Sequence, residues 1–453
     1  MKFILNQKVM ETGESPSFHT LDFLRKIGIK GVKEGCHEGD CGACMVLIGE
    51  LKDSQVKYKA MNSCILPLGR IEGKHVVTIE GLNLKEKLNP IQQALFDEGG
   101  VQCGYCTPGF VIALMAYFMN IDLEDTEIIT AVEGNICRCT GYNSILRAAE
   151  KASNVISSLD DSEGRIAALI KADYLPSYFS GIINQLKDIQ IEPQPEKGTY
   201  VAGGTDLFVN RQTAENPIFL AELGFDKIWS NESHVYVGAA ADIETIRTSE
   251  ELNFLFDTAH HLARVSSLPI RQQATIGGNV VNASPIGDLT IYFLALDAEI
   301  GLVLGEDKRI MKLKDFFKGY KILELQDREI VEWFRIKKEK KLLSFEKVAK
   351  RMHMDIASVN SALSLKIEDK KIKEPHLSGG GIGPIPMYLE KASQYLENKE
   401  ISSEVVKEAA RIADTEINPI DDVRGSAKYK RLLLRQLIYA HFVKLFPELE
   451  VSL

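Results

Sequence analysis

The sequence contains no cysteine after residue 139 and no apolar run long enough to cross a lipid bilayer. Its longest apolar stretch lies around residues 109–119, whereas a membrane helix needs about 20 such residues. The first ten residues, MKFILNQKVM, hold too few consecutive apolar residues for an export signal, and we expect a strand at Lys2 to Leu5 instead. The sequence therefore predicts neither a membrane segment nor secretion, and we expect a cytoplasmic location.

An excess of positive charge is also lacking. The 453 residues include 54 Lys and Arg against 63 Asp and Glu, which gives a formal net charge of −9. Surfaces that bind nucleic acids or anionic membranes are usually basic, so this balance argues against both kinds of partner. The shares of hydrophobic residues, 45%, and charged residues, 26%, are those of an ordinary globular chain, and the length indicates several domains.

The cysteines that the chain does have are clustered, because all eight fall in two groups of four. Four disulfides would suit a small secreted domain, but this chain shows no export signal and is long enough for ordinary hydrophobic cores. Incidental buried thiols would be scattered through the whole chain. The clustering therefore favours two metal sites, with zinc as the alternative to iron.

The first group has the C-x4-C-x2-C spacing, with a distant fourth cysteine, that ligates a plant-type 2Fe-2S cluster. Its members are Cys36, Cys41, Cys44 and Cys64. Glycines at 35, 39 and 42 let the backbone wrap closely, so that N–H groups can point at the sulfur atoms and tune the reduction potential. This spacing departs from the paired C-x2-C of structural zinc sites. We expect His37 to be a loop residue with a partly solvated ring and not a ligand.

The second group is a C-x2-C pair followed, after a helix-length apolar stretch, by a C-x-C pair. It consists of Cys103, Cys106, Cys137 and Cys139. Each pair stands before a predicted helix, over residues 110–119 and 142–152, and Pro108 suits an early turn of the former. Helix N-termini favour an anionic, thiolate-ligated cluster, so the pattern indicates a small helical bundle around a second metal site.

Two glycine-containing loops mark a later domain. The first follows a short predicted strand and comprises Val201, Ala202, Gly203, Gly204, Thr205, Asp206 and Leu207. The second runs through residues 275–279 and 283–288. Backbone N–H groups in such loops can cradle a pyrophosphate, but neither loop has the G-x-G-x-x-G spacing of a dinucleotide fold. Alone, each is more often a tight connection; together they suggest a dinucleotide held from both sides.

The motifs at Gly31 to Cys44, Val101 to Gly109 (VQCGYCTPG) and Asn135 to Tyr142 (NICRCTGY), followed by the two glycine loops, resemble the molybdenum hydroxylases of the xanthine dehydrogenase and aldehyde oxidase family. The chain looks most like the small iron–sulfur/FAD subunits of bacterial xanthine dehydrogenases. The resemblance implies a multi-domain α+β fold. Its parts are a β-grasp 2Fe-2S ferredoxin (1–75), a helical-bundle 2Fe-2S domain (76–155), a linker with a short helix (156–190), an α+β FAD-binding domain (191–339) and a small C-terminal α/β domain (340–453).

The resemblance also implies the cofactors and the residues that bind them. All eight cysteines would ligate two 2Fe-2S clusters, and Gln102 would lie near a molybdopterin cofactor on another subunit. A cation at Lys347 would favour the reduced, anionic flavin, whereas Lys350 is expected to be a solvated surface lysine. No catalytic residue is expected here, because the family's catalytic carboxylate lies on the molybdenum subunit. FAD would be bound by Val201, Ala202, Gly203, Gly204, Thr205, Asp206, Leu207, Thr275, Gly278, Asn279, Asp288, Val331 and Lys347.

A complete hydroxylase also needs a large molybdopterin domain, so the resemblance implies the electron-transfer subunit of an α2β2 enzyme with a large molybdopterin-binding partner. Electrons from hydroxylation of xanthine or hypoxanthine would pass through both clusters to FAD and then to NAD+. Tyr320 matches a tyrosine near the nicotinamide side of the flavin, while Val265 stands where animal members have a phenylalanine and removes aromatic stacking there. Two alternatives stay open: a hydroxylase for another heterocycle or an aldehyde, and a free-standing iron–sulfur flavoprotein electron carrier.

After residue 340 the sequence predicts short strands that alternate with helices. The segment 379–384 is rich in glycine and looks like a phosphate loop, but the prolines that follow favour a strand-to-helix turn. Arg424 and the aspartates beside it are expected to form structural ion pairs ahead of a last helix.

Overall fold

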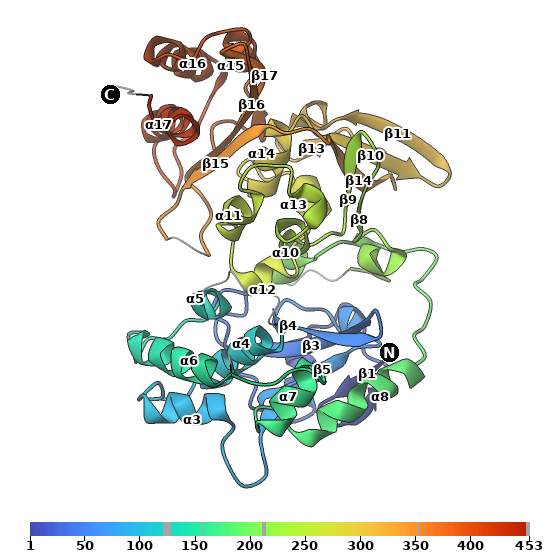
Figure 1. Cartoon of the computed structure of the whole chain (residues 1–453). Coiled ribbons are helices and arrows are strands. Elements are labelled where there is room, and N and C mark those ends of the chain that lie inside the picture. Colours follow the sequence, from blue (N-terminus) through green and yellow to red (C-terminus); the bar gives the residue numbers. More distant parts are fainter. Residues whose placement is uncertain (121–127, 157, 211–213, 352–353, 450–453) are drawn as a thin grey trace. The chain divides into compact units, whose positions relative to one another are not determined.

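The computed structural model describes residues 1–120, 128–156, 158–210, 214–351 and 354–449. The chain divides into two compact units, Met1–Phe219 with Ser267–Gln273, and Leu220–Ser266 with Ala274–Leu453 (Figure 1). Within the described ranges, no helix combines the length and the apolar character that a membrane span requires.

The N-terminal part of the first unit is a five-stranded sheet of order β2-β1-β5-β3-β4. β1 runs parallel to β5, and the other neighbours are antiparallel. Helix α1 (Thr20–Lys26) buries Leu21, Phe23 and Leu24 in the core beside this sheet. The strand predicted at Lys2 to Leu5 is confirmed. The strands are β1 (Lys2–Leu5), β2 (Lys8–Glu11), β3 (Met45–Lys52), β4 (Gln55–Asn62) and β5 (His75–Val77), and a 3-10 helix, η1 (Leu68–Ile71), precedes β5.

A group of helices follows the sheet in the same unit. They are α2 (Ile79–Leu82), α3 (Pro90–Asp97), α4 (Thr107–Met119), α5 (Ile128–Val132) and α6 (Asn143–Ile156). α4 is apolar along almost its whole length and packs against α3, α6 and the strands β3 and β4. α6 is amphipathic and turns Ile145, Ala149 and Ala152 inward. The helices predicted at 110–119 and 142–152 are therefore confirmed as α4 and α6.

The segment expected to be mostly linker is folded. It forms α7 (Arg165–Lys171), the 3-10 helix η2 (Ser177–Gly181) and α8 (Ile182–Asp188). Leu169, Tyr174 and Phe179 are buried in the same core as α4. The prediction of a linker over 156–190 with one short helix is therefore wrong in extent, because residues 165–189 are rich in apolar side chains that anchor the segment.

A short piece of distant sequence completes the first unit. The parallel pair β6 (Tyr200–Val201) and β7 (Ile218–Phe219) and the helix α9 (Thr205–Val209) are joined there by α12 (Leu268–Arg271). Arg271 is fully buried, and its guanidinium lies 2.7 Å from the carboxylate of Glu133, which is buried as well. The side-chain amide of Gln273 donates to the carbonyl of Ile65 at 2.9 Å. Residues 267–273 are thus part of the first unit's core.

The second unit begins with an antiparallel five-stranded sheet of order β11-β10-β14-β9-β8. Its strands are β8 (Ile228–Ser230), β9 (His234–Gly238), β10 (Glu299–Leu304), β11 (Asp307–Lys312) and β14 (Ile330–Lys337), and a small hairpin is formed by β12 (Phe317–Gly319) and β13 (Ile322–Leu323). The helices of this region share one hydrophobic core with the sheet. They are α10 (Ile243–Arg247), α11 (Thr258–Ala263), α13 (Ile276–Val281) and α14 (Asp288–Ala295), with 3-10 turns η3 (Leu220–Leu223), η4 (Glu250–Leu252) and η5 (Leu313–Asp315).

The rest of the second unit is a four-stranded antiparallel sheet followed by three helices. The strands are β15 (Leu342–Val348), β16 (Val359–Glu368), β17 (Lys371–Gly380) and β18 (Met387–Tyr388), and the helices are α15 (Glu390–Leu396), α16 (Ser403–Glu416) and α17 (Ala427–Leu445).

The alternation of strands and helices predicted after residue 340 is wrong. Asp369 and Lys370 both have positive φ and form a two-residue turn, so β16 and β17 pair directly as a hairpin. The glycines at 379 and 380 end β17, and the chain enters β18 before any helix.

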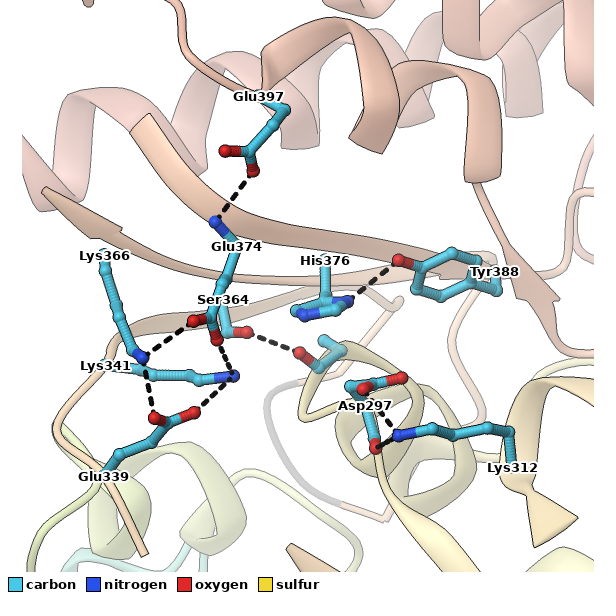
Figure 2. A network of polar contacts seen from close by, with 11 residues as sticks. Asp297, Lys312, Glu339, Lys341, Ser364, Lys366, Glu374, His376, Tyr388 and Glu397 are labelled. Carbon is cyan, nitrogen blue, oxygen red and sulfur yellow. Dashed lines mark hydrogen bonds and ion pairs between the residues drawn. The ribbon is translucent and has the colours of Figure 1, made fainter. Parts of the chain in front are cut away.

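Four charged side chains form a closed ring of ion pairs on this sheet (Figure 2). Lys366 Nζ lies 2.7 Å from Glu339 and 3.0 Å from Glu374, and Lys341 Nζ lies 3.4 and 3.5 Å from the same two carboxylates. The Lys341 side chain is only 5% exposed. The ring joins the residues just before β15 to β16 and β17 and compensates the burial of the two ammonium groups.

Candidate functional site

The first cysteine group lies around the loop that leads from α1 into β3. Cys36 and Cys41 belong to the loop, Cys44 directly precedes β3, and Cys64 follows β4. Sulfur atoms in this loop accept hydrogen bonds from backbone N–H groups, as the glycine pattern predicts. The N–H of Cys36 donates to Cys41 Sγ at 3.3 Å, and those of Glu38 and Asp40 donate to Cys36 Sγ at 3.4 and 3.3 Å.

These contacts favour the thiolate form at Cys36 and Cys44 and the thiol form at their partners Cys41 and Cys64, whose pKa values are raised. The hydrogen bond with Cys41, supported by the N–H groups of Glu38 and Asp40, lowers the pKa of Cys36 to about 5. Cys44 is fully buried, and its hydrogen bond with Cys64 lowers its pKa despite that burial. Four neighbouring sulfurs with backbone N–H donors among them would fit an anionic cluster.

Two glycines explain how the loop closes on these sulfurs. A Cβ at position 35 would lie 2.6 Å from Cys41 Sγ, so a side chain there would collide with that sulfur. Gly42 has φ +69°, and a Cβ there would collide with the carbonyl of Gly134. Both residues let the backbone approach other groups more closely than any side chain allows.

His37 differs from the prediction of a partly solvated ring. Its side chain is only 9% exposed, and its Nδ1 lies 3.0 Å from the Glu34 carboxylate. Its backbone has φ +61°, which turns the ring inward onto His19 at a centroid distance of 5.6 Å. Sequence spacing could not show this, because the burial comes from contact with a residue of α1's N-terminus.

The second cysteine group lies at the N-termini of α4 and α6. Cys106 is the N-cap of α4, and Cys139 Sγ lies 3.6 Å from Cys103 Sγ. The hydroxyl of Thr140 donates to Cys137 Sγ at 3.2 Å, and the N–H of Cys137 donates to the Tyr142 hydroxyl at 3.1 Å. Thr140 was not identified from the sequence, although a hydroxyl next to a C-x-C pair is a usable signal.

The thiols of this group also differ in their proton affinity. The N–H of Tyr105 and the thiol of Cys139 lower the pKa of Cys103, while burial and Cys137 raise the pKa of Cys106 to about 12. All eight cysteines are free of disulfides. Four sulfurs lie at two helix N-termini, and the unpaired N–H groups there favour an anionic cluster. The metal ions of such a cluster would offset the negative charge of the thiolates.

The two cysteine groups are linked by one backbone hydrogen bond. The N–H of Ile136, which precedes Cys137, donates to the carbonyl of Cys41 at 3.0 Å. The backbones also meet at Gly109, where a Cβ would collide with the carbonyl of Gly42. A continuous path of covalent bonds and this hydrogen bond therefore joins a sulfur of one group to a sulfur of the other.

The second group reaches the surface of the unit. Cys103 and Cys139 are exposed, and Gln102 is exposed next to them. Large apolar side chains beside these residues, Val101, Tyr105 and Tyr142, are exposed as well. This combination of apolar and sulfur-bearing surface is typical of a contact face for another protein.

The first glycine loop belongs to the first unit and connects β6 to α9. Gly204 is the N-cap of α9 and has φ +74°, and a Cβ there would lie 2.7 Å from the Phe208 ring. The carbonyl of Gly203 accepts a hydrogen bond from Gln273 at 3.4 Å. The turn itself therefore requires glycine at position 204, whether or not the loop binds a ligand. Val201 is buried at the end of β6.

The second glycine loop and the other predicted FAD residues belong to the second unit. Thr275 caps α13, and its hydroxyl accepts from the N–H of Gly278 at 3.1 Å. The side-chain oxygen of Asn279 accepts from the N–H and hydroxyl of Thr290 at 3.0 and 2.9 Å, which fixes α13 against α14. Val331 is buried in β14.

Asp288 and Lys347 are brought together as a buried ion pair. Lys347 Nζ lies 2.8 Å from the Asp288 carboxylate, and the two side chains are 6% and 13% exposed. Asn360 donates to the other carboxylate oxygen at 2.5 Å. Lys347 is therefore no solvated surface lysine, whereas Lys350 is exposed as predicted. Because Asp288 balances its charge, Lys347 would stabilise an anionic flavin less than an unpaired cation.

The two residues considered for the electron acceptor differ in exposure. Tyr320, at the turn of the β12–β13 hairpin, is 63% exposed, whereas Val265 is buried after α11. The ion pair expected near Arg424 forms between Asp422 and Lys430 instead, at 2.6 Å.

Models of three protein families match the chain. The [2Fe-2S] binding domain matches residues 78–150, the FAD binding domain in molybdopterin dehydrogenase matches residues 174–336, and the CO dehydrogenase flavoprotein C-terminal domain matches residues 344–445. The matched ranges contain the second cysteine group, both glycine loops and Lys347.

Curated relatives include xanthine dehydrogenases. The chain is 26% identical over 532 aligned residues to that of Drosophila subobscura, and 25% identical over 519 to the xanthine dehydrogenase/oxidase of Rattus norvegicus. Both alignments cover 99% of this chain but only 39% of the relative. The chain thus spans well under half the length of these relatives.

Solved structures share part of the fold. Carbon monoxide dehydrogenase from Hydrogenophaga pseudoflava matches with a TM-score of 0.51 and 21% identity, over 55% of this chain and 88% of that chain. Quinoline 2-oxidoreductase from Pseudomonas putida 86 matches with a TM-score of 0.50 and 20% identity, over 54% and 88%. At such identities the likeness is one of fold.

Proposed function

Because this chain belongs to the molybdenum hydroxylase family and carries its 2Fe-2S and FAD-binding domains, we propose that it is the electron-transfer subunit of a xanthine dehydrogenase. The observation that carries the proposal is the pair of cysteine groups joined by the Ile136–Cys41 hydrogen bond. Electron transfer from one cluster to another needs the two centres at short separation, and donors around them stabilise negative charge on the sulfurs.

The eight cysteines are the proposed ligands of two 2Fe-2S clusters. The clusters would supply one-electron chemistry, and FAD would supply the conversion to two-electron chemistry. Around the first cluster, N–H groups of Glu38 and Asp40 stabilise negative charge on sulfur. Around the second, the hydroxyl of Thr140 does the same for Cys137. The linked backbones hold the two sets of sulfurs at a fixed separation.

FAD is the proposed ligand of the two glycine loops and their neighbours. The N–H groups of residues 203–205, at the start of α9, and those at the N-terminus of α13 suit phosphate oxygens. Val331 offers an apolar contact to the ring system. Lys347 and Asp288 would place a paired, nearly neutral group beside the flavin, so we expect its potential to respond to changes in either residue.

A large molybdopterin-binding subunit is the proposed partner, within an α2β2 enzyme. The exposed surface around Cys103 and Cys139, with Gln102, Tyr105 and Tyr142, is where we propose that the partner docks. Covering this surface would shield the second cluster from water and bring a molybdenum centre close to it. The catalytic carboxylate of the hydroxylation is proposed to belong to the partner.

Xanthine or hypoxanthine is the proposed reductant, and NAD+ the proposed acceptor. The support is the similarity to xanthine dehydrogenases along 99% of this chain and the exposed Tyr320 on a hairpin of the flavin-domain region.

The domains are proposed to be residues 1–75, 76–155, 191–339 and 340–453, with the helical segment 156–190 between the second and third. The cytoplasm is the proposed location, because cluster ligation requires reduced thiols.

The test is NADH formation after addition of xanthine to the tagged chain purified with whatever binds it. Xanthine-dependent NADH formation, with iron and sulfide equal to two 2Fe-2S clusters and one FAD for each chain, is the expected result. If molybdenum and a large partner copurify but xanthine gives no NADH, the substrate and acceptor are wrong and another heterocycle or aldehyde takes their place. Absence of any partner would favour a free-standing electron carrier.

A further inference from the structure

Three side chains outside the cysteine groups converge beside the first cysteine loop. They are His19, the N-cap of α1; Asp22, in the first turn of the same helix; and His37, in the loop. One ligand atom from each lies within 4.8 Å of the others. Two imidazoles and a carboxylate are the donor set that zinc and other first-row divalent metals prefer in proteins.

The distances suit a tetrahedral ion after small side-chain rotations. His19 Nδ1 lies 3.4 Å from the Asp22 carboxylate. Ligand atoms about 2.1 Å from a tetrahedral zinc are roughly 3.4 Å apart, so this pair already has the required separation. His37 approaches from the loop, where a backbone φ of +61° turns its ring toward His19.

His37 is arranged as metal-binding histidines usually are. Its Nδ1 lies 3.0 Å from the Glu34 carboxylate, which fixes the ring and leaves Nε2 as the available donor atom. That Nε2 is buried and has no hydrogen-bond partner among the described residues. A buried ring nitrogen without a partner is costly, and a metal ion would remove this cost.

The surroundings leave a way in for the ion. The His19 and His37 side chains are 10% and 9% exposed, but Asp22 is 37% exposed, so the site opens to solvent on the Asp22 side. A water molecule can therefore complete the coordination. On its other side His19 contacts the Phe208 ring of α9 at a centroid distance of 5.8 Å.

We propose that His19, Asp22 and His37 bind one divalent zinc ion, with Glu34 orienting His37. The site joins α1 to the loop that holds Cys36 and Cys41, so the ion stabilises that loop. Its positive charge also lies near the first cysteine group and raises the reduction potential of any cluster bound there. The proposal is independent of substrate and acceptor, because it concerns only residues of the first unit.

The experiment is a titration of the purified holoprotein with zinc chloride after adventitious metal is removed with a mild chelator. Calorimetry and zinc content give affinity and stoichiometry. We expect one tightly bound zinc per chain, at least about 10-fold weaker binding in Asp22→Asn and His37→Gln, and about 10- to 100-fold weaker binding in Glu34→Gln. The matched control is Asp53→Asn, an exposed aspartate in the β3–β4 turn, which leaves zinc binding unchanged.

Visible absorption recorded during the titration separates this site from the cysteines. Zinc that binds at His19, Asp22 and His37 leaves the iron–sulfur absorption intact and shifts only a potential. The proposal is overturned if the wild type binds no zinc. It is equally overturned if the Asp22 and His37 variants bind as tightly as the Asp53 control, or if binding bleaches the clusters, since the zinc then occupies cysteines.

Discussion

Single side chains set the charge at both proposed redox sites. At the second cysteine group, Thr140 is the residue whose contribution can be isolated most cleanly, because its hydroxyl donates to Cys137 Sγ and its neighbours contact the sulfurs through the backbone. A donor to sulfur stabilises the more negative, reduced cluster. Loss of that donor therefore lowers the reduction potential.

We predict that Thr140→Val lowers the midpoint potential of one cluster by up to about 60 mV. A hydrogen bond to a charged sulfur contributes roughly 1.4 kcal/mol, which corresponds to about 59 mV for one electron. A redox titration followed by electron paramagnetic resonance measures it. Thr140→Ser keeps the hydroxyl and should retain the wild-type potential; an equal drop in both variants would assign the effect to packing.

In the second unit, the side chains of Asp288 and Lys347 form a buried ion pair. We predict that Asp288→Asn destabilises the second unit by about 3 kcal/mol, because it leaves a buried ammonium without its counter-charge. Chemical denaturation monitored by flavin fluorescence measures this. The double variant Asp288→Asn with Lys347→Met should recover most of the loss, and Lys350→Met, at an exposed site, should have no effect.

At the scale of elements, the strands of the C-terminal sheet are held together by ion pairs as well as by their hydrophobic core. The ring of Lys341, Glu339, Lys366 and Glu374 connects the entry into β15 with β16 and β17 (Figure 2). Burial raises the pKa of Glu374, but the hydrogen bond from Lys366 and the nearby lysine charges lower it by more. The pKa of Glu374 therefore lies below its usual range. Glu374 is therefore charged at neutral pH.

We predict that Lys341→Met lowers the stability of the second unit by about 3 kcal/mol, because two carboxylates are left facing a single remaining lysine. Thermal unfolding of the holoprotein measures the loss. Lys371→Met, an exposed lysine at the start of β17, is the matched control. A loss that vanished at high salt would show that the ring behaves as a surface network and would contradict the prediction.

The elements also show which parts of the fold the sequence can predict. The strand at 2–5 and the helices α4 and α6 follow from local apolar patterns and from the residues that begin helices, so they could be predicted. The order of the C-terminal elements could not, because it depends on a turn at Asp369 and Lys370 that places two non-glycine residues at positive φ. The burial of His37 and Lys347 arises from residues distant in sequence, such as His19 and Asp288, and no local pattern encodes it.

For the whole molecule, buried histidines link stability to pH. Burial lowers the pKa of His75 in the first unit to about 4, and in the second unit that of His261 to about 3 and that of His441 to about 4. All three side chains are fully buried. The folded chain therefore keeps them neutral at pH values where an unfolded chain would protonate them.

We predict that both units lose stability as the pH falls from about 6.5 toward 4, with no change from this cause above pH 7. The unfolded state takes up protons near its ordinary pKa of about 6.5, so each histidine costs at most on the order of 3 kcal/mol at the acid end. Urea unfolding at a series of pH values measures the slope. His441→Asn should flatten the slope for the second unit, whereas His234→Asn, at a partly exposed site, should not.

Residues 267–273 make the chain cross between its two units three times, since they leave the second unit, join the first and return. No single cut in the polypeptide can therefore separate the units. A gene split near residue 220 would leave the Arg271 segment on the wrong fragment and Glu133 without its guanidinium partner. To express either unit alone, residues 267–273 would have to be moved to the other fragment. The sequence motifs follow one another as separate domains, but the two folded units are not separate segments of the chain.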